Sequence, residues 1–301
     1  MPKTYHAKRI YQLLQIASWK SKSELSFSGF LQLSNRINDL LERTELRHDY
    51  PQIKQKYLNE LFLCTKEALA QGGEVRRSVD YINAILFYVG FSSWDQFEKC
   101  TVKTEGFINL PKANVKNYND KRIGVLTNQA HKDEIENNLE FTQKKMSYSI
   151  QCEVLDIEDA IDLHCQLKLK LTEYPLLVIT IPEVWEQLMV TSDLQADFRE
   201  ILNSGKVIPV PFGNSLYDPL LPSQILEDKG IASGEIGLLL ALSTIENRCT
   251  YSALTKDKSS PPCSASIQIG TLNNSGAIFT GNIYQENFGG NNSAASLARA
   301  L

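Results

Sequence analysis

Three short apolar stretches of this 301-residue chain end where a parallel sheet would place ligand-binding residues. Thr127 and Asn128 follow the first stretch, Thr180 follows the second and Pro211 follows the third. Ligands of open parallel sheets bind in the crevice beyond the carboxyl ends of the strands. We therefore expect these four residues to contact a small ligand, such as a nucleotide, if the chain binds one.

None of these strand ends leads into a known phosphate-binding loop. The chain has neither GxGxxG nor GxxxxGK[ST] after a predicted strand. Such loops depend on their glycines, because the backbone has to approach the phosphate closely. The chain also lacks a GxSxG nucleophile elbow and a cysteine–histidine pair of the protease type. These absences exclude a Rossmann dinucleotide site and a Walker-type phosphate site.

The cysteines and histidines do not have the spacing of metal ligands. Six cysteines are scattered along the chain without a CxxC pair, and no two of the four histidines lie within five residues of each other. His164 and Cys165 are the only adjacent pair of such ligands. Structural zinc sites and disulfide-stapled domains need closer spacing. We expect reduced thiols, no metal and no bound cofactor.

Between residues 121 and 248, strand-like and helix-like segments alternate. Leu176–Ile181 is a continuous apolar run without polar alternation, which indicates a strand buried on both faces. Alternating strands and helices form right-handed crossovers around a parallel sheet. The pattern predicts a flavodoxin-like α/β domain. Its strands are expected near 123–126, 150–155, 176–181 and 206–210, and its helices near 131–145, 157–170 and 185–202.

Residues 1–100 have the apolar spacing of helices. Ile10, Leu13 and Ala17 fall on one helical face, and similar patterns recur to residue 100. We predict an all-α helical bundle there, joined by a polar linker at 101–120 to the α/β domain. The closing phrase FYVGFSSWDQFEK resembles the ending of small helical modules found in bacterial proteins.

Beyond the α/β domain, we expect a connector at 249–265 and a β-rich tail at 266–301. The tail sets short apolar pairs, such as Ile267 and Ile269, between turns rich in Asn, Gly and Ser. It is too short to build a core of its own, and unpaired strand edges associate readily. We predict that the tail mediates self-association into a homo-oligomer.

The α/β segment resembles the Toll/interleukin-receptor (TIR) domain family over residues 121–245. The stretch RIGVLTNQAHKDEIENNL resembles the first strand, its Ser/Thr-rich turn and an acidic helix start. CEVLDIEDAID resembles a second strand that runs into an acidic loop, and LLVITIPEVW the hydrophobic third strand. The most specific piece is REILNSGKVIPVPFG, which contains a fourth strand of the GKxIPV type. The resemblance implies a TIR-like parallel sheet.

The resemblance also implies a catalytic position, because enzymatic TIR domains cleave NAD with a glutamate in the helix before the fourth strand. Counting back eight residues from Gly205 reaches Asp197, whose side chain is one methylene shorter than glutamate. Displacing a carboxylate by about an ångström costs about a hundredfold in rate. Glu200 lies one turn further on the same helical face and is the second candidate. Glu183 and Glu186 are further candidates.

The charge balance and the apolar runs indicate the partners and the location of the chain. There are 31 Lys and Arg residues against 35 Asp and Glu, a net charge of -4, which argues against a protein that coats nucleic acid. The longest apolar runs, at 175–182 and 236–242, are far shorter than the roughly 18 residues of a membrane span. The N-terminus lacks the apolar region of a signal peptide. We expect a cytoplasmic protein without membrane or nucleic-acid partners.

Three functions follow from these observations. The first is a bacterial signalling or defence adaptor or sensor, built on a self-associating TIR-like domain without efficient catalysis. The alternative is an effector that cleaves NAD or another nucleotide with Asp197 or Glu200, in which NAD is the substrate. A third function, a transcription regulator with an N-terminal DNA-binding bundle, has weaker support because acidic residues interleave the basic ones of the bundle.

Overall fold

The computed structural model describes residues 2–44, 46–108, 122–155, 160–181, 196–197, 200–201, 204–210, 212 and 233–259, with only the backbone for 47, 160, 161 and 248–259. Met1–Ser259 form one compact unit, and the description below concerns that unit. The predicted β-rich tail lies outside the described residues. No described helix is long and apolar enough to cross a membrane.

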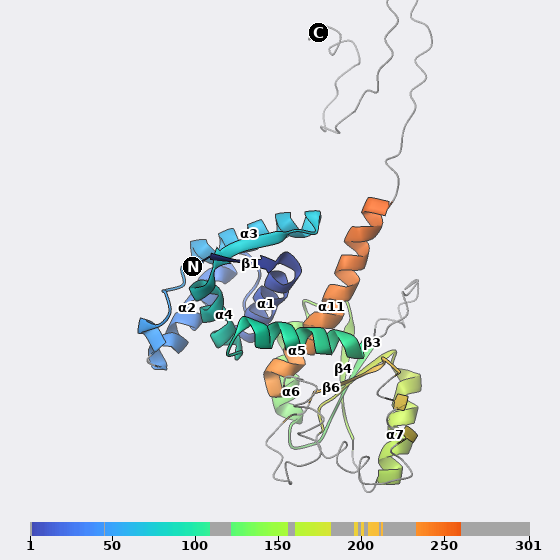
Figure 1. The fold of residues 1–301 in the computed structure, drawn as a ribbon. Coiled ribbons are helices and arrows are strands. Elements are labelled where there is room, and N and C mark those ends of the chain that lie inside the picture. Colours follow the sequence, from blue (N-terminus) through green and yellow to red (C-terminus); the bar gives the residue numbers. More distant parts are fainter. Residues whose placement is uncertain are drawn as a thin grey trace, which may run out of the picture. The chain divides into compact units, whose positions relative to one another are not determined.

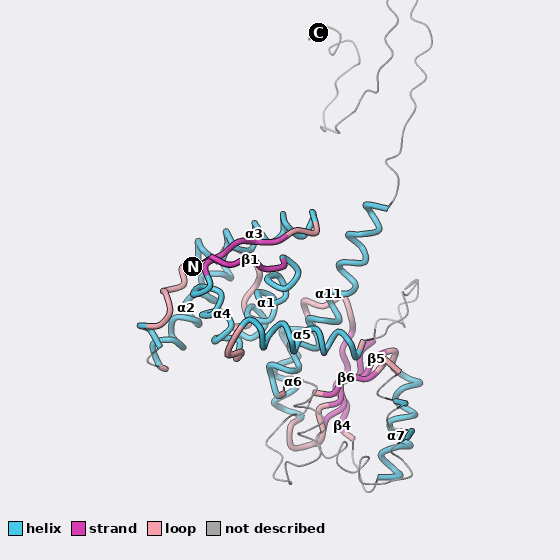
Figure 2. The backbone as a smooth tube through the Cα atoms, viewed as in Figure 1, coloured by secondary structure: helices cyan, strands magenta, loops and turns pink. Residues whose placement is uncertain are grey.

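The N-terminal part is helical, as predicted, but it is not purely α (Figures 1 and 2). Two short strands, β1 and β2, pair antiparallel, with Tyr5 opposite Val75. Both of these side chains are buried, while most of their strand neighbours are exposed, so the ribbon closes one side of the helical core. The prediction of an all-α bundle is therefore wrong in this respect. The two strands lie about 70 residues apart in the chain, so their pairing leaves no periodic pattern of apolar residues in the local sequence. The elements are β1 (Pro2–His6), α1 (Ala7–Lys20), α2 (Phe27–Arg43), the 3-10 helix η1 (Leu46–His48), α3 (Gln55–Gln71), β2 (Glu74–Ser78), α4 (Val79–Val89) and α5 (Trp94–Phe107).

Local signals explain where several of these helices begin and end. Ser26 and Ser93 cap α2 and α5, because their side-chain oxygens accept from the backbone N–H groups of Gly29 and Gln96. Gly72 ends α3 and Gly90 ends α4, both in the left-handed conformation that glycine adopts without strain. α5 continues to Phe107, into the stretch predicted as a linker. Several of the buried residues in this stretch are polar, such as Thr101 and Thr104. The sequence therefore lacks the apolar spacing of a packed helix, and its polar composition suggested a linker.

The second part contains a four-stranded parallel sheet with the order β4-β3-β5-β6 (Figure 2). This parallel α/β arrangement was predicted, and its strand order is compatible with a flavodoxin-like layout. α6 and α7 follow β3 and β4, as the alternation of segments indicated. The elements are β3 (Arg122–Thr127), α6 (Lys132–Gln143), β4 (Ser149–Val154), α7 (Ala160–Glu173), β5 (Leu176–Ile179) and β6 (Val207–Pro209).

Successive residues of the strands point to opposite faces, and both faces are buried. On β5, Leu176 and Val178 join one hydrophobic core, whereas Leu177 and Ile179 join another. All four are at most 1% exposed, so the prediction of a strand buried on both faces is confirmed. The first core, here called the shared core, continues from the sheet through the helical bundle.

The helix α11 (Gly234–Ser259) connects the bundle and the sheet within the shared core (Figure 1). It packs against α1 and α5, and every residue from Leu238 to Ile245 is buried. Gly90 approaches it so closely that a Cβ atom at that position would lie 2.1 Å from Cδ1 of Ile236. The helix runs to Ser259, so most of the predicted connector is helical.

Candidate functional site

The carboxyl ends of β3 and β5 lie side by side at one edge of the sheet. Leu126 pairs with Ile179 in the parallel register, so the next residues, Thr127 and Thr180, are neighbours at this edge. The backbone N–H and the hydroxyl of Thr180 both donate to the carbonyl oxygen of Leu126, each at 2.9 Å. The Thr127 hydroxyl donates to the Asn128 carbonyl at 3.3 Å. Both hydroxyl protons are therefore used by the backbone, and the two threonines are 0% and 1% exposed, so neither hydroxyl is presented at the surface of this edge.

Asn128 shapes the turn that leads from β3 into α6. Its Oδ1 accepts from the N–H of His131, three residues on, at 3.0 Å, which is the spacing of a capping side chain. The imidazole of His131 lies 5.8 Å from the ring of Phe212, measured between centroids. Phe212 is held at this edge because its N–H donates to the Thr180 carbonyl at 3.0 Å. The edge thus presents a partly exposed amide and a partly exposed imidazole, two groups that hydrogen-bond to polar ligands.

Three of the four residues predicted to bind a ligand are therefore close to one another in the structure. Thr127, Asn128 and Thr180 share this edge, and Pro211 lies outside the described residues. Their role in binding stays a prediction.

Asp197, the first catalytic candidate, contacts two basic residues in the middle of α7. Its Oδ2 lies 3.2 Å from Nζ of Lys168, which donates a hydrogen bond, and 3.3 Å from Nε2 of His164. The histidine is 9% exposed, and its Nε2 does not meet hydrogen-bond geometry with the carboxylate. That second contact is therefore electrostatic, and attractive only when the imidazole is protonated. The Asp197 carboxylate thus forms an ion pair with α7.

Glu200, the second catalytic candidate, lies on the surface. It is exposed, whereas the next residue, Ile201, is buried against the α7 face of the sheet. Within the described part of the chain, Glu200 forms no ion pair, and no hydrogen bond or ion pair connects Asp197 or Glu200 to Thr127, Asn128 or Thr180. The other two candidates, at 183 and 186, lie outside the described residues.

A further polar cluster joins β4 to the end of α7. Lys170 lies 2.6 Å from Glu153 and 2.7 Å from Glu173. The phenol of Tyr174 donates to Glu153 and lies 2.6 Å from Oε1 of Gln151. The ring of Tyr174 packs directly on β3, since a Cβ atom on Gly124 of that strand would lie 2.9 Å from Cδ2 of Tyr174.

The charges in this cluster are mutually compensated. Burial opposes the ionisation of Glu153, but hydrogen bonds from Lys170 and Tyr174 outweigh it and lower the pKa of the carboxyl group. Hydrogen bonds to Glu153 and Glu173 raise the pKa of Lys170. Burial, with the hydrogen bond to Glu153, raises the pKa of Tyr174 to about 12. The lysine stays charged and the tyrosine stays neutral near pH 7, which suits a structural cluster better than a proton-transfer site.

Sequence reasoning missed His131, Phe212, Glu153 and Tyr174. The spacing of Asn128 and His131 is a local signal that could have indicated a turn at the start of α6. Glu153 is a charged residue within a strand, which indicates a paired side chain. The contact between His131 and Phe212 joins residues far apart in the chain and has no local signal.

The comparisons with known proteins do not identify a relative. No protein-family model, no curated protein and no solved structure matches this chain. Within the described ranges, no group of three or more His, Cys, Asp or Glu residues could hold a metal ion.

Proposed function

We propose that this chain is a bacterial adaptor or sensor of the signalling or defence type, built on a TIR-like segment that self-associates and does not cleave NAD efficiently. The four strands that carry the resemblance are parallel, in the order β4-β3-β5-β6. The stretch with the GKxIPV-type motif contains β6, and the stretch LLVITIP contains β5. Each quoted stretch supplies one strand of a parallel sheet, which is the arrangement that the resemblance implies.

The contacts of Asp197 are the observation that carries the non-catalytic part of the proposal. The residue is shorter than the glutamate of NAD-cleaving TIR domains, and Lys168 and His164 both contact its Oδ2. A carboxylate that accepts a hydrogen bond from a charged lysine is a weaker nucleophile or base than a free one. The side chain is 45% exposed, so the ion pairs are screened by solvent and can break.

Nicotinamide release tests this proposal directly. Full-length protein is incubated with NAD, and nicotinamide is measured by chromatography beside Asp197→Asn and Glu200→Gln. We expect release at the buffer rate for all three proteins. Release by the wild-type protein that Asp197→Asn or Glu200→Gln abolishes would establish the alternative function, an NAD-cleaving effector. Asp197→Glu restores the family's carboxylate length, and activity gained only in this variant would support both the TIR-like alignment and the inactive wild type.

Self-association is supported by exposed apolar side chains on the bundle. Phe27 and Leu31 are one turn apart on α2 and are 59% and 51% exposed. Exposed apolar side chains on neighbouring turns of one helix favour contact with a partner surface. We infer that this face acts together with the predicted tail at 266–301.

Light scattering at tens of micromolar tests the self-association. We expect an oligomer for the full chain and a smaller species after truncation at residue 263 or in Phe27→Glu/Leu31→Glu. Leu169→Glu is the matched control, because Leu169 is 57% exposed on α7 and is expected to leave the oligomer intact. A monomeric full-length protein would contradict self-association.

A further inference from the structure

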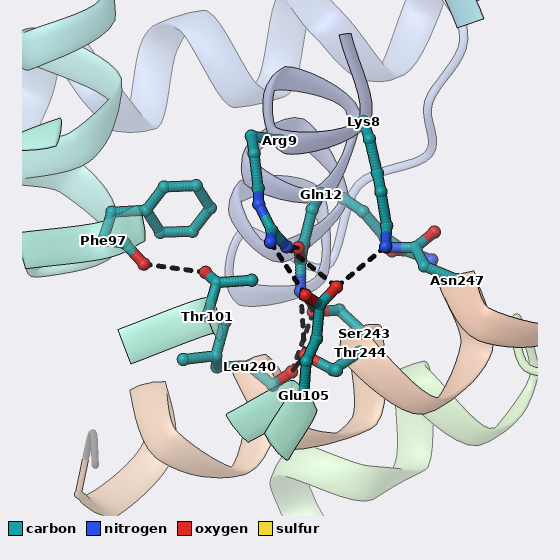
Figure 3. Close-up of polar contacts among 11 residues, drawn as sticks. Lys8, Arg9, Gln12, Phe97, Thr101, Glu105, Leu240, Ser243, Thr244 and Asn247 are labelled. Atoms are coloured by element: carbon teal, nitrogen blue, oxygen red, sulfur yellow. Dashed lines mark hydrogen bonds and ion pairs between the residues drawn. The ribbon is translucent and has the colours of Figure 1, made fainter. Parts of the chain in front are cut away.

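A row of buried polar side chains lies where α11 meets α1 (Figure 3). The Nε2 of Gln12 lies 3.2 Å from Oγ of Ser243 and 2.9 Å from Oγ1 of Thr244, to which it donates. One turn along, Nδ2 of Asn247 donates to Oε1 of Gln15 at 3.1 Å. These five residues, here called the polar seam, are at most 6% exposed. Because buried amides need partners, the seam determines how far α11 lies along α1.

One group of the seam is unsatisfied. Oδ1 of Asn247 is buried and has no hydrogen-bond partner among the described residues. Leaving a buried acceptor unpaired is unfavourable, so the observed register has an energetic cost at this asparagine.

A shift of α11 by one turn offers that oxygen a donor. Ser243 and Asn247 are four residues apart and lie on the same helical face. A one-turn shift places Asn247 opposite Gln12, whose Nε2 now donates to the two hydroxyls. The hydroxyls of Ser243 and Thr244 keep their own hydrogen bonds during the shift, because both donate to the Leu240 carbonyl within α11, at 3.0 and 2.7 Å. One-turn shifts of packed helices are a known form of conformational switching.

We propose that α11 has two registers against α1 and that the change between them couples the helical bundle to the carboxyl edge of the sheet. α11 lies in the shared core with Val178, Ile208 and Phe212. Since that core is close-packed, a shift of α11 changes the packing under these three side chains. Phe212 contacts His131 at the candidate site. The coupling does not depend on whether the sheet acts in signalling or in NAD cleavage.

Two variants that differ by one substitution move the equilibrium in opposite directions. Gln15→Leu removes the partner of Asn247 in the observed register only, so it favours the shifted register. Gln15→Leu/Asn247→Leu removes the unpaired oxygen and leaves an apolar pair. In the shifted register, the leucine introduced by Asn247→Leu would face the amide of Gln12. The double variant therefore favours the observed register.

Hydrogen exchange of the full chain, read by mass spectrometry, measures the effect at a distance. For peptides that contain 176–180 and 207–210, we expect exchange about tenfold faster in Gln15→Leu, the effect of one unpaired buried amide. In the double variant, exchange in the same peptides should be slower than in wild type. Asn38→Leu is the control, since it removes two hydrogen bonds to Ile53 within the bundle. Once the loss of global stability measured in urea is subtracted for each variant, Asn38→Leu should leave the sheet peptides unchanged.

Exchange that changes only within α1 and α11, or a control with the same pattern as Gln15→Leu, would overturn the coupling. If Gln15→Leu fails to fold, the proposal is tested by hydrogen exchange of the double variant Gln15→Leu/Asn247→Leu alone. Sheet peptides that then exchange as fast as wild type, or faster, contradict the proposal, and slower exchange supports it.

Discussion

The two faces of the parallel sheet are buried in different ways. One face, with Val125 and Val178, belongs to the shared core, which extends as far as Phe30 in the bundle. The opposite face, with Leu126 and Leu177, packs against α7 in a core confined to the sheet and its nearest segments. The first face therefore joins two parts of the chain that the sequence separates, whereas the second is a local structure.

The polar groups beside the two faces differ in the same way. On the bundle side, the polar seam is buried and its members come from helices more than 200 residues apart in sequence. On the α7 side, Asp197 and Lys168 are about half exposed. The shared core is the larger of the two, so we expect a cavity on the bundle side of the sheet to cost more stability than a cavity on the α7 side.

The largest effect is expected from a cavity in the shared core. Leu239 is 1% exposed on α11, and Leu239→Ala should lower the free energy of unfolding by about 2–5 kcal/mol. Because bundle and sheet share this core, circular dichroism and tryptophan fluorescence should shift together in urea. The fluorescence is read in a Trp185→Phe background, so that only the bundle residues Trp19 and Trp94 emit. Leu167→Ala, a cavity on the α7 side, is the comparison. A fluorescence midpoint that Leu239→Ala leaves unchanged would show that the two parts unfold separately.

A smaller effect is expected where the bundle touches α11. Gly90 has φ of 116°, and an added Cβ would meet Ile236, so Gly90→Ala should cost about 1–3 kcal/mol from strain and crowding. Gly72→Ala is the control, because Gly72 also has a positive φ but has open space around it. Thermal denaturation of both variants separates backbone strain, which both share, from crowding against Ile236, which only Gly90→Ala has. Adding Ile236→Ala should relieve part of the Gly90→Ala defect, and strict additivity would argue against the contact.

The third effect depends on pH and concerns Glu105 of α5. Burial opposes its ionisation, but hydrogen bonds from Arg9, at 2.8 and 2.9 Å, and from Lys8, at 2.8 Å, outweigh burial and lower its pKa. A carboxyl group whose pKa is lower in the folded state stabilises the protein above its unfolded pKa. That contribution is lost as the pH falls through the folded pKa.

Glu105→Gln should therefore destabilise the protein by about 1–2 kcal/mol near pH 7 and by less below about pH 4. Urea denaturation at both pH values provides the measurement, with Glu60→Gln as the control, because the ion pair of Glu60 with Lys56 is exposed. A difference between wild type and Glu105→Gln that stays constant with pH would contradict the assignment.

The parallel sheet was predictable because its signals are local. The run around Val178 has no polar alternation, and the segments before and after it have helical spacing. Two buried faces follow from that pattern alone. The edge residues Thr127 and Thr180 could likewise be placed together, because parallel strands end at the same side of a sheet.

The connection between bundle and sheet was not predictable, because its signals are polar and distant. Thr104 and Asn247 have the composition of a linker or a solvated helix, and only their burial within the fold shows otherwise. The position of Asp197 was predicted from a motif, but its pairing with Lys168 depends on how α7 packs. Partners of this kind are set by the tertiary structure and leave no period in the sequence.

The distance in sequence between Gln12 and Ser243, 231 residues, has a consequence for synthesis. The ribosome completes α1 long before α11 exists, so the bundle cannot finish its packing as an N-terminal domain normally does. Contacts of such high sequence separation also slow folding. Until α11 arrives, one side of α1 and α5 remains uncovered. A fragment that ends near residue 100 should therefore aggregate, and the nascent chain should depend on chaperones for most of its length.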